Sequence, residues 1–162
     1  MEGEDEKITD SRKYILDTNV FNHVLDGKIS PEELQGHELF ATHVQRDELE
    51  QTNSSERRIK LLSVFKYVAP NLIPTKSAGW GVSRWGQCEW SDNDGVYEAI
   101  LDRVKHLDEM SKKTKLPENQ SRDALIAETA IKAGLTLVTN DKNLTIAAQG
   151  NGCQVVDGVE GL

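Results

Sequence analysis

Apolar positions along the chain predict short strands separated by helices. Residues 13–17 form an apolar run that ends in a carboxylate, and helical spacing follows through Leu25. A second apolar run covers residues 38–42, and a helix over 43–52 follows it. Later elements are predicted as helices over 56–68, 96–107, Ser121–Gly134 and after Asp141, with strands at 72–73, 135–139 and 153–156. This alternation indicates an α/β fold with a mostly parallel sheet and helices on both faces.

Residues 76–95 follow neither a helical nor a strand period, so we expect a long surface loop rich in glycine and tryptophan. All three tryptophans of the chain lie here, at Trp80, Trp85 and Trp90. One hypothesis is that they form a flap with Arg84 and stack unpaired bases, which makes Arg84 and Trp85 candidate substrate contacts. The alternative is that the tryptophans pack on the domain or on a partner subunit.

Length and composition predict a single globular unit. The chain has 162 residues, of which 37% are apolar and 28% charged, and this balance is typical of a folded domain. We expect an acidic, flexible arm at residues 1–12 and one domain over 13–162. No apolar run approaches the roughly 18 residues of a membrane span, and the acidic start is unlike a secretory signal. The sequence therefore predicts a cytoplasmic protein without a membrane partner.

Charge and metal-ligating residue types exclude several classes of protein. A net charge of −8 argues against binding nucleic acid through a broad basic face, although a local patch remains open. The basic run at 112–115 is either a solvated connector or a phosphate contact.

Cys88 and Cys153 are expected to be free thiols, and the four scattered histidines lack the spacing of a zinc site. No GxGxxG motif follows the first strand, which excludes a dinucleotide-binding domain.

Four acids are predicted to meet at one edge of the sheet. Sites in open α/β sheets form beyond the C-terminal ends of the strands, where Asp17 and Asp141 follow two of the predicted strands. A helix that leads into a parallel strand begins at this same edge, so Asp123, in the first turn after a cap at Ser121, can join them. Glu48 reaches the edge from the helix after the second strand.

Such a cluster predicts a site for hard metal ions. Four neighbouring carboxylates cannot all stay ionised without cations, and oxygen ligands of this kind suit Mg²⁺ or Mn²⁺. These ions position phosphates and activate water in phosphodiester cleavage. Each acid alone has a simpler explanation: Asp141 could cap a helix, Asp123 could complement a helix dipole, and Glu48 could be a solvated acid. The ordered set is harder to explain in this way.

The acidic segments resemble those of PIN-domain nucleases, a family that includes the toxins of VapBC toxin–antitoxin pairs. The resemblance rests on YILDTNV at 14–20, DELE at 47–50, SRDALIA at 121–127 and LVTND at 137–141, and it spans residues 13–156. It implies a three-layer α/β/α sandwich, Mg²⁺- or Mn²⁺-dependent cleavage of RNA, an antitoxin partner where the protein is a toxin, and dimerisation.

By this resemblance, the catalytic, metal-coordinating acids are Asp17, Glu48, Asp123 and Asp141. Asn19 would orient Asp17, and Thr139 would support Asp141. Asp47 and Glu50 are alternatives to Glu48, which is preferred because it directly precedes a leucine.

Two other functions compete with a nuclease. A catalytically inactive PIN-like module would bind RNA or a protein with the same fold. A phospho-acceptor signalling domain would also carry aspartates at strand ends, with a lysine such as Lys142 after a later strand. No acidic pair precedes Asp17, which argues against the signalling domain.

Overall fold

The structure is a computed structural model that describes residues 12–68, 70–77 and 94–162. The predicted arm at 1–12 lies outside the described residues except for its last position. Most of the predicted loop at 76–95 does too, including Arg84 and the three tryptophans. Within the described ranges, no helix combines the length and the apolarity of a membrane span.

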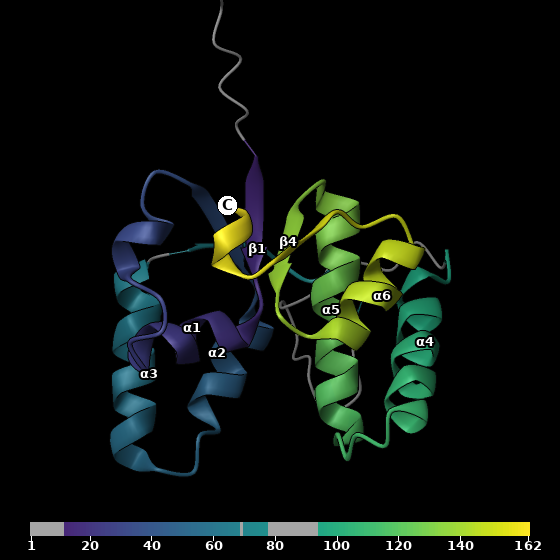
Figure 1. Cartoon of the computed structure of the whole chain (residues 1–162), viewed down its shortest axis with the longest axis horizontal. Helices are drawn as coiled ribbons and strands as arrows, with labels where there is room; N and C mark the ends of the chain where they lie inside the picture. Colours follow the sequence, from purple (N-terminus) through teal and green to yellow (C-terminus); the bar gives the residue numbers. More distant parts are fainter. Residues whose placement is uncertain (1–11, 69, 78–93) are drawn as a thin grey trace, which may run out of the picture.

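Five parallel strands form one sheet, which confirms the predicted α/β class (Figure 1). The strand order is β3-β2-β1-β4-β5, and every neighbouring pair is parallel. The first strand therefore lies at the centre, with the second strand on one side and the fourth on the other. The strands are β1 (Lys13–Leu16), β2 (Glu38–Ala41), β3 (Asn71–Leu72), β4 (Thr136–Thr139) and β5 (Val155–Asp157).

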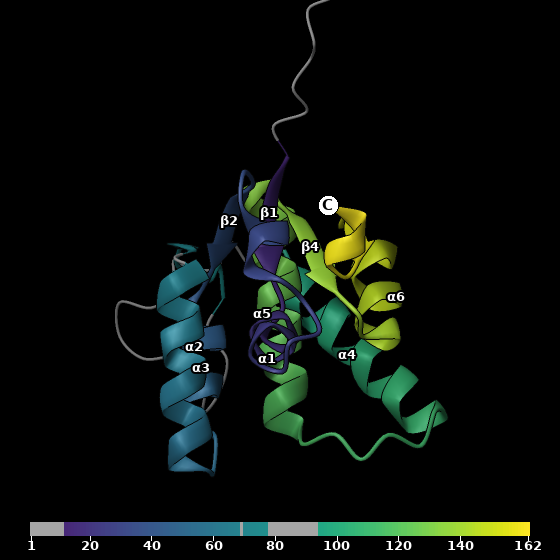
Figure 2. The same cartoon turned by 60° about the vertical axis from the view of Figure 1, so that its left-hand side comes forward.

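Helices cover both faces of this sheet and complete a three-layer α/β/α arrangement (Figures 1 and 2). The helices α1, α2 and α3 lie to one side of β1 and β4 in Figure 1, and α4, α5 and α6 lie to the other. Short 3₁₀ segments at Pro31–Leu34 and Val159–Gly161 complete the elements. The helices are α1 (Thr18–Leu25), α2 (His43–Glu50), α3 (Ser55–Val68), α4 (Val96–Met110), α5 (Pro117–Ala133) and α6 (Lys142–Gly150).

Two apolar clusters fill the space between the layers, because side chains of a strand point alternately to opposite faces. Ile15 and Leu137 pack into the cluster formed with α4, α5 and α6. Leu16 and Val138, their neighbours in the chain, pack into the cluster formed with α1 and α3. Burial on both faces explains why β1 and β4 each have consecutive apolar residues rather than strict alternation. The C-terminal ends of these two buried strands form the edge of the sheet at which the site lies.

The start of α5 corrects one prediction. The helix begins at Pro117, four residues before Ser121, and its N-terminal flanking residue Leu116 is extended. Proline suits the first helical turn because it has no N–H to leave unpaired and its φ is already helical. Ser121 is therefore inside the helix, and Asp123 lies in the second turn rather than the first. The predicted end is confirmed, since Gly134 adopts a left-handed φ of 68° just after the helix.

Candidate functional site

The acidic residues gather where the sheet changes direction. The chain goes from the central strand β1 to β2 on one side, and later strands continue from β4 on the other side. Ligands of open α/β sheets bind at such a switch point, outside the C-terminal ends of the strands. Asp17 directly follows β1, and Asp141 lies two residues beyond the end of β4. Both therefore lie at the edge where the fold favours a binding site.

The Asp17 carboxylate is buried and held by two hydrogen bonds. Its side chain accepts the backbone N–H of Thr18 at 2.8 Å through one oxygen and the hydroxyl of Thr139 at 2.8 Å through the other. Its own backbone N–H donates to the carbonyl of Val138 at 3.0 Å, which continues the pairing of β1 with β4. Only 5% of the residue is exposed. The carboxylate is thus fixed in position before any ligand arrives.

Burial raises the pKa of Asp17 to about 6, and the negative charge of Glu48 adds to the shift. The hydrogen bonds from Thr139 and Thr18 lower the pKa and offset part of this effect. A neighbouring cation would stabilise the ionised form of such an acid.

Glu48 is brought to Asp17 by helix α2. Buried Gln45 anchors this helix, because its amide N–H donates to the Leu16 carbonyl at 2.9 Å, at the end of β1. One turn further on, Glu48 accepts the hydroxyl of Thr18 at 2.7 Å. Its alternative Glu50 instead pairs with Arg46 at 3.3 Å, where both side chains are about half exposed. Of these two acids of α2, Glu48 is the one that contacts the residue beside Asp17.

Asp123 lies opposite Asp17 on α5 and is 9% exposed. Burial raises the pKa of Asp123 well above its ordinary value, and the charge of Asp17 is the next largest cause. Lys115 lowers this pKa but offsets only part of the increase. Asp17 and Asp123 are therefore two buried acids whose charges act on one another, an arrangement that favours a shared proton or a cation between them.

Asp141 has a structural role as well as a place in the cluster. One carboxylate oxygen accepts the backbone N–H groups of Asn143 and Leu144 at 3.0 and 3.1 Å, which caps α6. The other oxygen accepts a hydrogen bond from the Lys115 ammonium at 2.9 Å, and the Lys113 ammonium lies 3.5 Å from the capping oxygen. Despite partial burial, these donors keep the pKa of Asp141 below its ordinary value. Asp141 therefore caps α6 and also belongs to the acidic cluster.

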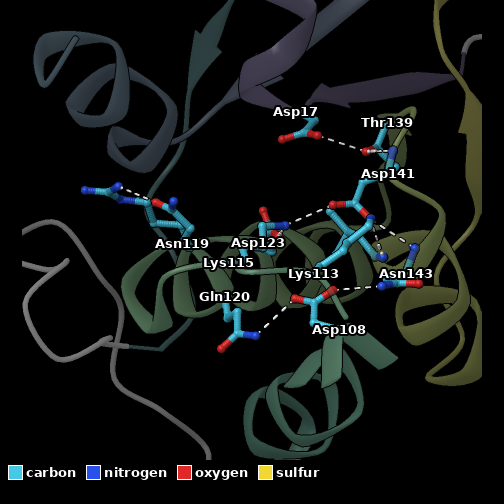
Figure 3. A network of polar contacts seen from close by, with 12 residues as sticks. Asp17, Asp108, Lys113, Lys115, Asn119, Gln120, Asp123, Thr139, Asp141 and Asn143 are labelled. Atoms are coloured by element: carbon cyan, nitrogen blue, oxygen red, sulfur yellow. Dashed lines mark hydrogen bonds and ion pairs between the residues drawn. The ribbon is translucent and has the colours of Figure 1, made fainter. Parts of the chain in front are cut away.

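Lys115 is a member of the cluster that the sequence analysis did not identify. Its ammonium contacts both Asp123 and Asp141, as Figure 3 shows. Although burial lowers the pKa of Lys115, the two carboxylates outweigh it and hold the pKa above its ordinary value. One signal could have revealed it: Lys115 leads into α5, which begins at the acidic edge. The explanation of residues 112–115 as a wholly solvated connector is wrong for Lys115, whose side chain is 22% exposed.

The two predicted supporting residues are placed differently. Thr139 accepts the backbone N–H of Asp141 at 3.1 Å, and it also donates to Asp17, so one hydroxyl contacts both strand-end acids. Asn19 is exposed in the first turn of α1. The hydrogen bonds that orient Asp17 come from Thr18 and Thr139, rather than from Asn19 as expected.

Two polar networks hold the helices around the acids. Buried Arg122 donates to the side chain of Gln51 at 2.6 Å, which joins the start of α5 to the end of α2. Asp108 of α4, 1% exposed, accepts hydrogen bonds from the side-chain amides of Gln120 at 3.0 Å and Asn143 at 2.8 Å (Figure 3). The first network ties the helix of Asp123 to the helix of Glu48, and the second ties three helices together beneath Asp141.

The chemistry of the donors fits Mg²⁺ or Mn²⁺, because both ions prefer carboxylate oxygens. Burial is the main cause of the raised pKa values of Asp17 and Asp123, and the neighbouring carboxylate charges that add to it would be offset by a cation. In the described part of the chain, however, no three acids, histidines or cysteines are arranged to surround a metal ion. The ammonium of Lys115 contacts two of the four acids, Asp123 and Asp141.

Comparison with solved structures supports the fold. A chain of DNA-bound VapBC from Salmonella typhimurium superposes with a TM-score of 0.50 at 15% identity, over 90% of this chain and 98% of that one. FitAcB from Neisseria gonorrhoeae gives 0.45 at 16% identity, over 89% and 96%. VapBC-5 of Mycobacterium tuberculosis, from the VapBC family of toxin-antitoxin systems, gives 0.41 at 19% identity, over 89% and 95%. No family model and no curated protein matches the chain. The predicted PIN-like resemblance is confirmed at the level of the fold.

Proposed function

We propose that this protein is a Mg²⁺- or Mn²⁺-dependent endoribonuclease that hydrolyses phosphodiester bonds at the cluster of Asp17, Glu48, Asp123 and Asp141. The observation that carries the proposal is the pair Asp17 and Asp123, two buried carboxylates with raised pKa values at the switch point of the sheet. Burying two acids whose charges act on one another costs stability, and strongly shifted acids of this kind are common at functional sites.

The cluster would hold the metal through its carboxylate oxygens. A bound divalent ion would orient a phosphate, activate water and stabilise the leaving oxygen. The chain's own contribution is orientation: Thr139 and the Thr18 N–H fix the direction of Asp17, and the Thr18 hydroxyl fixes Glu48. Donors arranged in advance spare the site from reorganising when charge develops on the phosphate.

Substrate and partners are proposed from the motif resemblance. Single-stranded RNA is the proposed substrate, and an antitoxin protein and a second copy of the chain are the proposed partners. Arg84 and Trp85, outside the described residues, stay proposed substrate contacts.

The experiment that tests this proposal compares two acids of α2. Labelled single-stranded RNAs are incubated with wild type, Glu48→Gln and Glu50→Gln in Mn²⁺, Mg²⁺ or EDTA. We expect metal-dependent cleavage by the wild type, a loss of about tenfold or more in Glu48→Gln, and near wild-type cleavage by Glu50→Gln, whose side chain pairs with Arg46. Equal cleavage by both variants would remove Glu48 from the site.

A second candidate is a PIN-like module that binds RNA or a protein without cutting. The observation that favours it is the ion pairing of Lys115 with Asp123 and Asp141, which balances part of the acidic charge from within the chain. This candidate predicts a folded protein that neither cleaves RNA nor takes up Mn²⁺ in calorimetry. A nuclease is expected both to cleave RNA and to take up Mn²⁺.

A further inference from the structure

Lys115 differs from Lys113, a second lysine of the same connector, in burial and in the contacts it makes. Its side chain is 22% exposed and reaches Asp123 and Asp141, which belong to α5 and to the turn after β4. The side chain of Lys113 is 45% exposed and approaches Asp141 alone, at 3.5 Å. Lys115 is therefore a built part of the acidic cluster, and Lys113 is at its rim.

The position of Lys115 is set by the fold. The residue lies two positions before Pro117, where α5 begins, so its backbone is held at the same edge of the sheet as the acids. Asp141 cannot turn away from it easily, because the other oxygen of that carboxylate caps α6 through two backbone N–H groups. Asp123 is buried on the second turn of α5. One partner of the ammonium is thus fixed by its cap and the other is buried in α5.

Lys115 already supplies positive charge at one side of the acidic cluster. The cluster has four acidic side chains, and two lysines contact it. Lys115 supplies a positive charge between two of these acids, at the place where a second cation would bind. A second divalent ion would have to displace Lys115 from carboxylates that already hold it.

We propose that the Lys115 ammonium permanently takes the place of one cation in this cluster, so that the chain binds a single divalent ion, on the side of Asp17 and Asp123 away from Lys115. This inference rests on the proposed nuclease function and defines the metal content of its site. Lys115 acts here as a positioning residue: it holds Asp123 and Asp141 in place by charge and competes with a second ion.

The test counts bound metal ions. Wild type, Lys115→Met and Lys113→Met are titrated with Mn²⁺ alone, with free Mn²⁺ measured by electron paramagnetic resonance and binding heat by calorimetry. We expect one bound ion in the wild type and in Lys113→Met. In Lys115→Met we expect a second ion, or affinity for the first ion raised at least about tenfold. Lys115→Arg, which keeps the charge, should bind one ion.

Two bound ions in the wild type would overturn the inference, even where Lys115→Met does not fold. An unchanged count and affinity in folded Lys115→Met would also overturn it. RNA cleavage by the same samples separates this inference from the nuclease proposal. A second ion in Lys115→Met without cleavage by any sample supports the inference and contradicts the nuclease. Cleavage by the wild type, with an unchanged ion count and affinity in Lys115→Met, supports the nuclease and contradicts the inference about Lys115. A lack of Mn²⁺ binding by every sample contradicts both the inference and the nuclease.

Discussion

The hydroxyl of Thr139 donates to the carboxylate of Asp17 across two neighbouring strands, at 2.8 Å. The same oxygen accepts the backbone N–H of Asp141 at 3.1 Å. One buried hydroxyl therefore links the ends of β1 and β4, and with them two of the four acids. The hydrogen bond from this hydroxyl lowers the pKa of Asp17 and offsets part of the increase caused by burial.

Thr139→Val should damage this link while keeping the shape of the side chain. The Asp141 N–H and one oxygen of Asp17 lose their partner, so we expect the unfolding free energy to fall by about 1 to 3 kcal/mol and the pKa of Asp17 to rise further. RNA cleavage should fall about tenfold or more. Thr139→Ser keeps the hydroxyl and should retain most of the cleavage. Urea unfolding and cleavage rates measure both effects, and equal cleavage by the two variants would contradict the link.

Asp17→Asn should stabilise the metal-free protein at neutral and alkaline pH. The pKa of Asp17 rises from 3.8 to about 6 on folding, so the folded state binds this proton more tightly than the unfolded state. The unfolding free energy therefore falls as pH rises through this window, and the full penalty is present above pH 6. Removing the charge should recover about 1 to 3 kcal/mol at pH 8, with little difference near pH 4.

Urea unfolding in EDTA between pH 4 and pH 8 measures the effect of Asp17→Asn. Asp47→Asn is the matched control, because it makes the same Asp-to-Asn change at a half-buried position of α2. A protein with Asn at position 17 that is less stable than the wild type at pH 8 would show that the buried carboxylate is not a cost to the fold.

Asp141→Asn and Asp141→Ala should separate capping from charge. Asparagine can still accept the N–H groups of Asn143 and Leu144, whereas alanine cannot. Only the alanine variant should lose about 1 kcal/mol from the cap of α6. Both variants should lose Mn²⁺ affinity, because both lose the carboxylate charge. Unfolding and calorimetry test this pair, and full Mn²⁺ affinity in Asp141→Asn would leave Asp141 with a capping role alone.

Local patterns predicted much of the fold and the positions of the strand-end acids. The turns that follow β1 and β4 come directly after buried apolar runs, so Asp17 and Asp141 could be placed at one edge from the order of elements alone. The start of α5 was harder, because Ser121 and Pro117 are both helix-start signals. The fixed φ of proline prevailed, and Asp123 consequently lies one turn deeper and is buried.

Contacts between distant side chains could not be predicted from periodicity. Nothing in the spacing of apolar positions shows that Lys115 reaches Asp141, 26 residues later in the chain. Likewise, the amide of Gln45 on the Leu16 carbonyl, which directs α2 and Glu48 toward the site, depends on how the helix packs against the strand end. The hypothesis about the tryptophans falls on residues outside those that the structure describes.

The nuclease function is tested most directly by cleavage of a mixed pool of labelled single-stranded RNAs by wild type and Asp17→Asn, each with Mn²⁺, with Mg²⁺ and with EDTA. We expect cuts by the wild type that require the metal and vanish in Asp17→Asn, although that variant is folded and at least as stable. No cleavage by well-folded wild type, together with no Mn²⁺ binding in calorimetry, would contradict the nuclease function.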